Sequence, residues 1–103
     1  QVPGKTALRA VLLERLATAY EESGDWQKAA EQHQAAGQIN DFPLRISALA
    51  AAARCYLETG DTEKALQIYK PIGAKEEDAK QLAPHVRARL DELVAAQELK
   101  PAA

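Results

Sequence analysis

The chain has little of what a disulfide-stabilised or membrane-spanning protein requires. Its 103 residues include one cysteine, Cys55, so no disulfide can form within the chain and a disulfide scaffold is excluded. No apolar run reaches the roughly 18 residues of a transmembrane helix, and no secretory signal peptide is recognisable. Methionine is absent even at position 1, which indicates a fragment or a processed form.

The chain also has no large excess of charge of one sign. The 13 lysines and arginines are nearly matched by 15 aspartates and glutamates, and the basic residues are spread from Lys5 to Lys100 without a dense run. Nucleic acid and anionic membranes are bound by basic stripes, so we expect no nucleic-acid binding and no direct membrane insertion of this segment. The length suits one modest core, and we expect residues 1–103 to form a single domain.

Residues that could carry chemistry form no recognisable pattern. His33 and His85 lie far apart in the sequence, whereas a metal site needs three or four converging ligands. We expect His33 to fill an aromatic packing position and Cys55 to pack as a small apolar residue. Glu76–Asp78 lacks the alternating ligands of a calcium loop, and no phosphate loop, nucleophile elbow or HExxH motif occurs. We therefore expect no enzyme activity, no cofactor and no metal.

What the sequence does contain is an internal repeat of 36 residues. When residues 8–37 are laid over residues 44–73, eleven positions are identical. Unrelated segments of ordinary composition would share about two or three. The matches include Tyr20 with Tyr56 and Gly24-Asp25 with Gly60-Asp61. Two copies of one supersecondary unit are predicted.

Each copy contains two helical apolar stripes separated by Gly-Asp. In the first copy, apolar residues recur every four positions, which is typical of one face of a helix. The apolar face predicted for this first helix consists of Leu8, Leu12, Leu16 and Tyr20, with Leu13 and Ala17 beside them. No strand-like alternation occurs, so the chain is predicted to be all-α.

Glycine and aspartate mark the predicted helix ends. Gly24-Asp25 and Gly60-Asp61 are each expected to end one helix and cap the next. Gly37 and Gly73 are expected to end the second and fourth helices. Asp41, two residues before a proline, is expected to cap the third helix.

Two segments resemble the tetratricopeptide repeat family. The first is Leu16–Tyr20 followed by Gly24–Ala29, and the second is Ala52–Tyr56 followed by Gly60–Ala65. The resemblance implies a right-handed α-solenoid of two helix-turn-helix repeats, at residues 8–40 and 43–73. A polar connection at 74–82 and a C-terminal capping helix at 83–98 complete it. The chain departs from the family at His33 and Thr62, which replace aromatic residues, and in its period, which is two residues longer.

The Gly-Asp turns, the Lys-Ala pairs and the arginine-rich last helix are also similar to bacterial membrane-anchored helper proteins of the export channel. This second resemblance implies a soluble domain of a bacterial membrane-anchored or envelope protein.

The resemblance further implies a concave groove lined by the first helix of each repeat, which would bind a peptide or helix segment of a partner protein. The residues predicted to line it are Val11, Glu14, Arg15, Thr18, Glu21, Ser47, Ala50, Ala51, Arg54 and Leu57. The Lys and Asn pairs with which some members clamp a chaperone's terminal carboxylate are missing. An ordinary solvated face is the alternative. If the groove is used, Arg54→Glu or Glu14→Arg should alter partner capture without altering the melting temperature.

A structural role is the alternative function. Two repeats and a cap are fewer than the three repeats that usually give independent stability. The missing surface would come from homo-oligomerisation or from further repeats of a larger bacterial envelope protein. The surfaces expected to self-associate are Leu8, Leu12 and Ala51, or the last helix.

Overall fold

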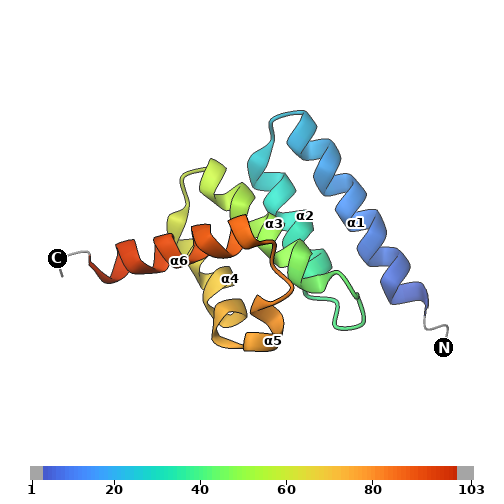
Figure 1. The fold of residues 1–103 in the computed structure, drawn as a ribbon. Coiled ribbons are helices and arrows are strands. Elements are labelled where there is room, and N and C mark those ends of the chain that lie inside the picture. The colour runs from blue at the N-terminus through green and yellow to red at the C-terminus, as the bar shows by residue number, and fades with distance from the viewer. Residues whose placement is uncertain (1–3, 100–103) are drawn as a thin grey trace.

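The computed structural model describes residues 4–99 and consists of helices joined by short turns (Figure 1). The helices are α1 (Gly4–Glu22), α2 (Trp26–Gly37), α3 (Arg45–Glu58), α4 (Thr62–Ala74), α5 (Glu76–Ala79) and α6 (Pro84–Glu98). No strand occurs within the described range. The predicted all-helical repeat fold is confirmed, and the single turn α5 lies within the segment expected to be a polar connection.

The turn between α1 and α2 follows directly from Gly24-Asp25. Gly24 has a φ angle of 82°, in the left-handed region that glycine adopts without strain. Its N–H donates to the carbonyl of Glu21 at 3.0 Å, and the N–H of Asp25 donates to the carbonyl of Tyr20 at 2.9 Å. These two bonds make a Schellman turn. The Asp25 carboxylate then accepts the backbone N–H of Lys28, which caps α2.

The turn between α3 and α4 repeats this geometry 36 residues later. Gly60 has a φ angle of 85°, and the N–H of Asp61 donates to the carbonyl of Tyr56 at 2.9 Å. The Asp61 carboxylate accepts the N–H of Lys64 at 3.1 Å. Both predicted Gly-Asp turns, with their caps, are therefore confirmed.

Small side chains allow the helices to pack closely in chain order, α1 on α2, α2 on α3 and α3 on α4. The fully buried residues at these contacts are Ala10, Ala17, Ala29, Ala30, Ala36, Ala48, Ala52, Ala53 and Ala65. Larger side chains at such positions would force the helices apart. The aromatic rings of Tyr56 and Tyr69 are buried in the same core and fill the remaining space.

The apolar face predicted for α1 is only partly buried. Leu8, Leu12 and Leu16 are 58%, 57% and 43% exposed, whereas α1 buries Ala10 and Ala17 completely. The physical reason is position in the stack. As Figure 1 shows, α1 is the outermost helix and has α2 on one side only, so its leucine stripe has no covering helix within the described residues.

Gly37 ends α2 as predicted, but its role lies in packing. A Cβ atom at Gly37 would lie 2.5 Å from the Cγ and Cδ2 atoms of Leu49. Glycine therefore permits the close approach of α3. The expected stop at Gly73 is wrong, because α4 continues to Ala74 and Gly73 instead faces Leu90 of α6.

The predicted start of the third helix is also wrong. Helix α3 begins at Arg45, and Leu44 occupies the cap position without a side-chain hydrogen bond. Asp41 lies too far upstream to cap it. Its carboxylate instead accepts a hydrogen bond of 2.7 Å from the hydroxyl of Thr6, which joins the α2–α3 connection to the beginning of α1.

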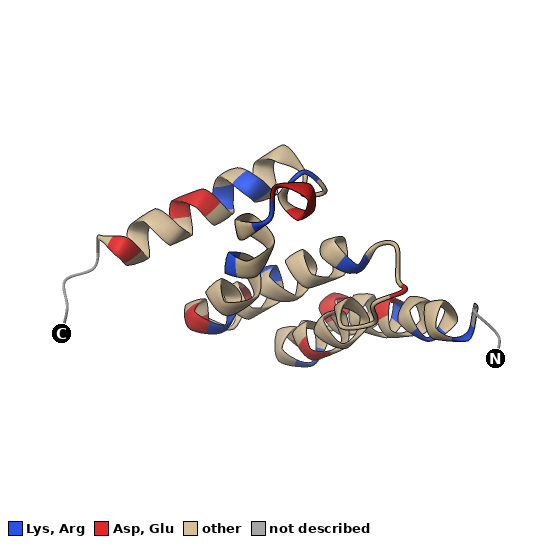
Figure 2. Cartoon of the chain, turned by 90° about the horizontal axis from the view of Figure 1, so that it is seen from below, with Lys and Arg blue, Asp and Glu red and all other residues tan. Residues whose placement is uncertain are grey.

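Helix α6 packs against α4 rather than alongside α3. Leu90 is its one buried residue among those described, and Val86, Leu93 and Val94 pack partly against the core. Beyond these contacts α6 projects from the body, so the two ends of the chain lie far apart (Figures 1 and 2). Its orientation leaves space between α6 and α3.

We expect Gly37→Ala to destabilise the protein by roughly 1–2 kcal/mol, because the added methyl group overpacks the contact with Leu49. Gly73→Ala at the equivalent position of the second repeat is the control. There the new Cβ would lie 3.3 Å from the Cδ2 atom of Leu90, a milder overlap than at Gly37, so we expect a smaller loss of stability. Urea denaturation monitored by circular dichroism measures both, and equal losses would contradict the packing argument.

Candidate partner-binding groove

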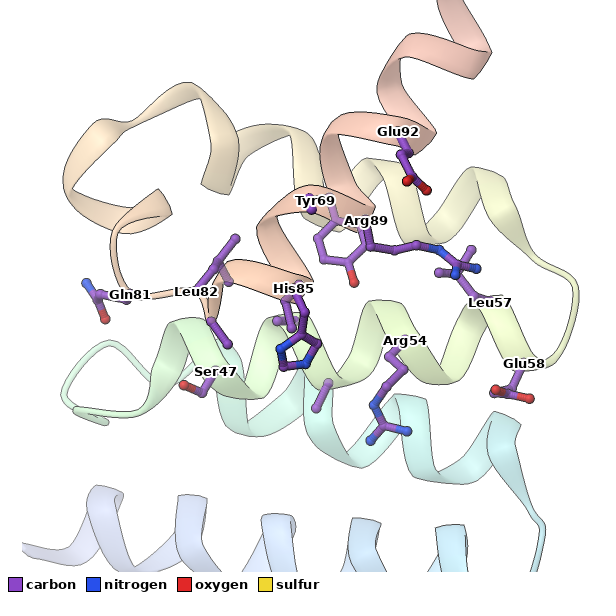
Figure 3. A pocket seen from close by; sticks show the side chains of 15 residues that line it. Ser47, Arg54, Leu57, Glu58, Tyr69, Gln81, Leu82, His85, Arg89 and Glu92 are labelled. Atoms are coloured by element: carbon purple, nitrogen blue, oxygen red, sulfur yellow. The ribbon is translucent and has the colours of Figure 1, made fainter.

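A groove of about 740 Å³ lies between α3 and α6 and reaches Tyr69 of α4 (Figure 3). Helix α3 contributes Ser47, Ala50, Ala51, Arg54, Leu57 and Glu58. Helix α6 and the connection before it contribute Gln81, Leu82, Ala83, His85, Val86, Ala88, Arg89 and Glu92. In Figure 3, His85 projects from α6 toward α3. The groove is therefore a cleft between two helices of which only one belongs to a repeat.

The groove is open because small residues meet a tilted helix. Ala50 and Ala51 place only methyl groups on the α3 side. On the other side, Leu90 holds α6 against Gly73 of α4, where the absence of a side chain allows close contact. Because α6 is fixed to α4 in this way, it does not close over α3.

The lining combines an apolar surface with charges of both signs. The apolar part is formed by alanine, leucine and valine side chains, while Arg54 and Arg89 are balanced by Glu58 and Glu92. Burial raises the pKa of Tyr69, and the charges of Arg89 and Arg54 oppose that shift without reversing it. Such a surface suits a segment that has apolar and charged side chains together.

The structure divides the predicted groove residues into two sets. Those on α3 line the cleft, namely Ser47, Ala50, Ala51, Arg54 and Leu57. Those on α1 do not, namely Val11, Glu14, Arg15, Thr18 and Glu21. The residues on α6 were missed, because nothing in the sequence indicates that the capping helix faces α3. The spacing of His85, Arg89 and Glu92 shows only that they share one face of a helix, not what that face contacts.

Two of the α1 residues belong instead to a charged cluster between α1, α2 and α3. His33 of α2 is 5% exposed, and its Nδ1 contacts a carboxylate oxygen of Glu14. Its Nε2 lies 2.5 Å from Oε2 of Glu21, and Arg54 donates to Oε1 of the same carboxylate at 2.8 Å. We call Glu14, Glu21, His33 and Arg54 the junction cluster.

His33 is buried, as expected for a packing position, and in addition both of its ring nitrogens contact carboxylates. A carboxylate only accepts hydrogen bonds, so both ring nitrogens must carry protons to bind Glu14 and Glu21. Burial lowers the pKa of His33, but hydrogen bonds with Cys55, Glu14 and Glu21 outweigh it and raise the pKa to about 10. Burial likewise raises the pKa of Glu21, but the bonds from His33 and Arg54 bring it below its ordinary value.

The junction cluster changes how charge-reversal variants are interpreted. Arg54→Glu would place a carboxylate beside Glu21, and Glu14→Arg would place a cation beside the charged ring of His33. Both changes bring like charges together at a partly buried site. On this geometry we expect both variants to lower the melting temperature as well as to alter partner capture.

Comparison with known families agrees with the repeat architecture. The tetratricopeptide repeat family model matches residues 20–90, and the chain belongs to this family. No curated protein and no solved structure shows a significant match to the chain. Tetratricopeptide repeats generally mediate protein–protein interaction and are typically non-enzymatic modules.

The surface adds two observations. Basic and acidic residues are interspersed along the helices in Figure 2, without a stripe of one sign on the part of the chain that the structure describes. Over that same part, no helix combines the length and the apolar character needed to cross a membrane.

We expect the free energy of unfolding to fall as the pH rises from about 6.5 toward about 10. The folded protein keeps the His33 proton over this interval, whereas the unfolded chain has released it, so raising the pH favours unfolding. Urea denaturation at a series of pH values measures the slope of the free energy of unfolding against pH. The buffer contains a chelator, so that only protons bind the ring nitrogens.

His33→Gln should lose this slope, and His85→Gln should keep it, because His85 is exposed and lies outside the junction cluster. A slope that is unchanged in His33→Gln would show that His33 is not the titrating group.

Proposed function

We propose that the chain is a protein-interaction module whose groove between α3 and α6 binds a short segment of a partner protein. The observation that carries this proposal is the 740 Å³ groove itself, which has an apolar lining and charges at its edges. Its volume is within the range of roughly 300–1,000 Å³ that is typical of ligand-binding clefts. The occupant is an extended peptide or one face of an amphipathic helix.

The lining indicates what that segment looks like. Apolar side chains of the partner would contact Ala51, Leu57 and Val86 and release water from them. Its charged side chains would meet Arg89 and Glu92, which lie one turn apart on α6. Arg54 is available only in part, because Glu21 already holds its guanidinium group. A segment with both apolar and charged residues is therefore favoured over a purely acidic or purely basic one.

The proposal assigns the chain no catalytic role, as an adaptor or chaperone-like helper. In the setting implied by the resemblance to helper proteins of the bacterial export channel, the partner would be an export client or another envelope protein. The groove requires neither a metal nor a cofactor for this binding.

We expect Ala51→Trp to weaken partner capture about tenfold or more, which corresponds to ~1.4 kcal/mol of binding free energy. Ala51 is half-buried and lines the groove, so an indole ring there would occupy the partner's space. The measurement is affinity capture from the lysate of the native organism, with quantitative mass spectrometry of the proteins that the immobilised wild-type and variant chains retain.

Arg15→Trp is the matched control. Arg15 is exposed and holds the position of α1 that corresponds to Ala51, but it does not line the groove. A partner that is retained by wild type and Arg15→Trp and lost by Ala51→Trp supports the proposal. Retention of the same proteins by all three would refute it.

Self-association is a second candidate function, favoured by the exposed leucine stripe of α1. Leu8, Leu12 and Leu16 lie at helical spacing with about half of each side chain in water. Contiguous exposed apolar surface of this kind commonly marks an interface. In this reading, two chains would cover each other's α1 helices.

If two chains do associate through α1, Leu12→Glu should abolish the dimer, because it would bury an unpaired carboxylate in the interface. Leu99→Glu is the control, since Leu99 is exposed but lies at the far end of the chain from α1. Light scattering over a concentration series measures the mass. A wild-type monomer at all concentrations would remove this function.

A further inference from the structure

The junction cluster borders the only thiol of the chain. Cys55 of α3 is completely buried, and its sulfur atom lies close to the ring of His33 and the carboxylate of Glu21. One potential ligand atom from each of these three residues lies within 4.8 Å of the other two. The three side chains come from three different helices, α1, α2 and α3. Their convergence is therefore a product of the stack and not of local sequence.

The donor set is the one that zinc prefers. Thiolate sulfur, imidazole nitrogen and carboxylate oxygen bind zinc at about 2.3, 2.0 and 2.0–2.2 Å, in a tetrahedral arrangement. Ligand atoms around such an ion are roughly 3.3–3.6 Å apart. The His33–Glu21 contact of 2.5 Å would open by about 1 Å, and the Cys55 sulfur, which lies within 4.8 Å of both, would approach by no more than about 1.5 Å. Side-chain rotation can supply movements of this size.

The neighbouring residues have the positions that metal sites require. Zinc-binding histidines usually hold their second ring nitrogen against a carboxylate, which fixes the direction of the first. Glu14 is placed in this way on Nδ1 of His33, while Nε2 contacts Glu21. Arg54 binds Oε1 of Glu21 and leaves Oε2 for the metal. The side chains of Glu14 and Glu21 are 28% and 19% exposed, which gives an ion a path from solvent.

Charge balance allows a zinc ion to replace protons in this largely buried site. With protons on His33 and on the Cys55 thiol, the cations His33 and Arg54 balance Glu14 and Glu21. A zinc ion would displace two protons, one from the imidazolium and one from the thiol. Two positive charges leave and two arrive, so the cluster remains neutral. Neither form places a net charge in the interior.

We propose that Glu21, His33 and Cys55 bind one zinc ion, with water in the fourth position and Glu14 orienting the imidazole. The ion joins α1 to α2 and α3. Its effect is to fix the outermost helix of the stack, which otherwise has a neighbour on one side only.

The second repeat has no counterpart of this site. The residues that correspond to Glu21 and His33 are Leu57 and Tyr69, which line the groove between α3 and α6. None of the three zinc ligands lines the proposed binding groove, but Arg54 is shared, because it lines the groove and also holds Glu21.

The test is a titration of the apo 103-residue chain with cobalt(II), a spectroscopic substitute for zinc. Because Cys55 is the only thiol, a thiolate-to-cobalt charge-transfer band reports on this residue alone. We expect the band to saturate at one equivalent of cobalt and to disappear when zinc is added. Zinc should also raise the melting temperature, because it binds the folded chain. The absence of a band, or a band without any effect of zinc on melting, would overturn the proposal.

Variants identify the ligands. His33→Gln should abolish the band, His85→Gln should leave it unchanged, and Glu14→Gln should weaken zinc binding by about 10- to 100-fold. If His33→Gln does not fold, Cys55→Ala is the second variant to test. We expect it to fold, because the first repeat has alanine at the corresponding position 19. Calorimetry should show a loss of zinc affinity of about 100-fold or more in Cys55→Ala. Unchanged zinc affinity in Cys55→Ala, or a band that persists in His33→Gln, would exclude this ligand set.

Discussion

Close approach of helices through side chains no larger than a methyl group is the constraint on which the rest of this structure depends. Ala17, Ala29, Ala53 and Ala65 are completely buried, and Gly37 has no room for even a methyl group beside Leu49. With so little side-chain volume between the helices, packing leaves few alternative arrangements of neighbouring pairs. The two identical Gly-Asp turns then fix the direction in which each second helix returns.

The same repeat produces two different junctions. Between α1, α2 and α3, the available space is occupied by charged groups centred on His33. At the following junction, Leu57 and Tyr69 stand in the positions of Glu21 and His33, and α6 packs against α4 without closing on α3. That space stays open as the groove. Polar residues thus fill the first junction and link its helices by ion pairs. Apolar residues and a tilted helix leave the second junction open as a surface for a partner.

The sequence predicted what is determined locally. The turns at Gly24 and Gly60 need only a left-handed residue followed by a cap, so their positions and geometry could be inferred from Gly-Asp. Apolar periodicity in α1 identified a stripe but could not say whether a neighbour covers it. Leu8 and Leu12 lie on that stripe and are mostly exposed, because α1 is the outermost helix. Helical spacing shows which residues share a face, but burial depends on which elements exist beside it.

The groove and the junction cluster illustrate the same limit for the site. The α3 side could be predicted because its residues follow one face of a repeat helix. The α6 side depends on the contact of Leu90 with Gly73, a tertiary contact that no local pattern encodes. His33 looked isolated because its partners lie 12 or more residues away in sequence, on other helices. When α1 packs against α2, Glu14 and Glu21 of α1 lie beside the imidazole ring of His33.

The two edges of the stack differ in how readily they can accept insertions and deletions. Both Gly-Asp turns lie at one edge, while the 38–44 connection and the segment around α5 lie at the opposite one (Figure 1). The turns at the first edge are fixed, because each turn is hydrogen-bonded to the helices it joins. The second edge has connections of unequal length, and one of them leads through Gln81 and Leu82 directly into the groove. Insertions or deletions there would reshape the binding surface while the stacked helices keep their places, so recognition can diversify from one edge of an otherwise fixed frame.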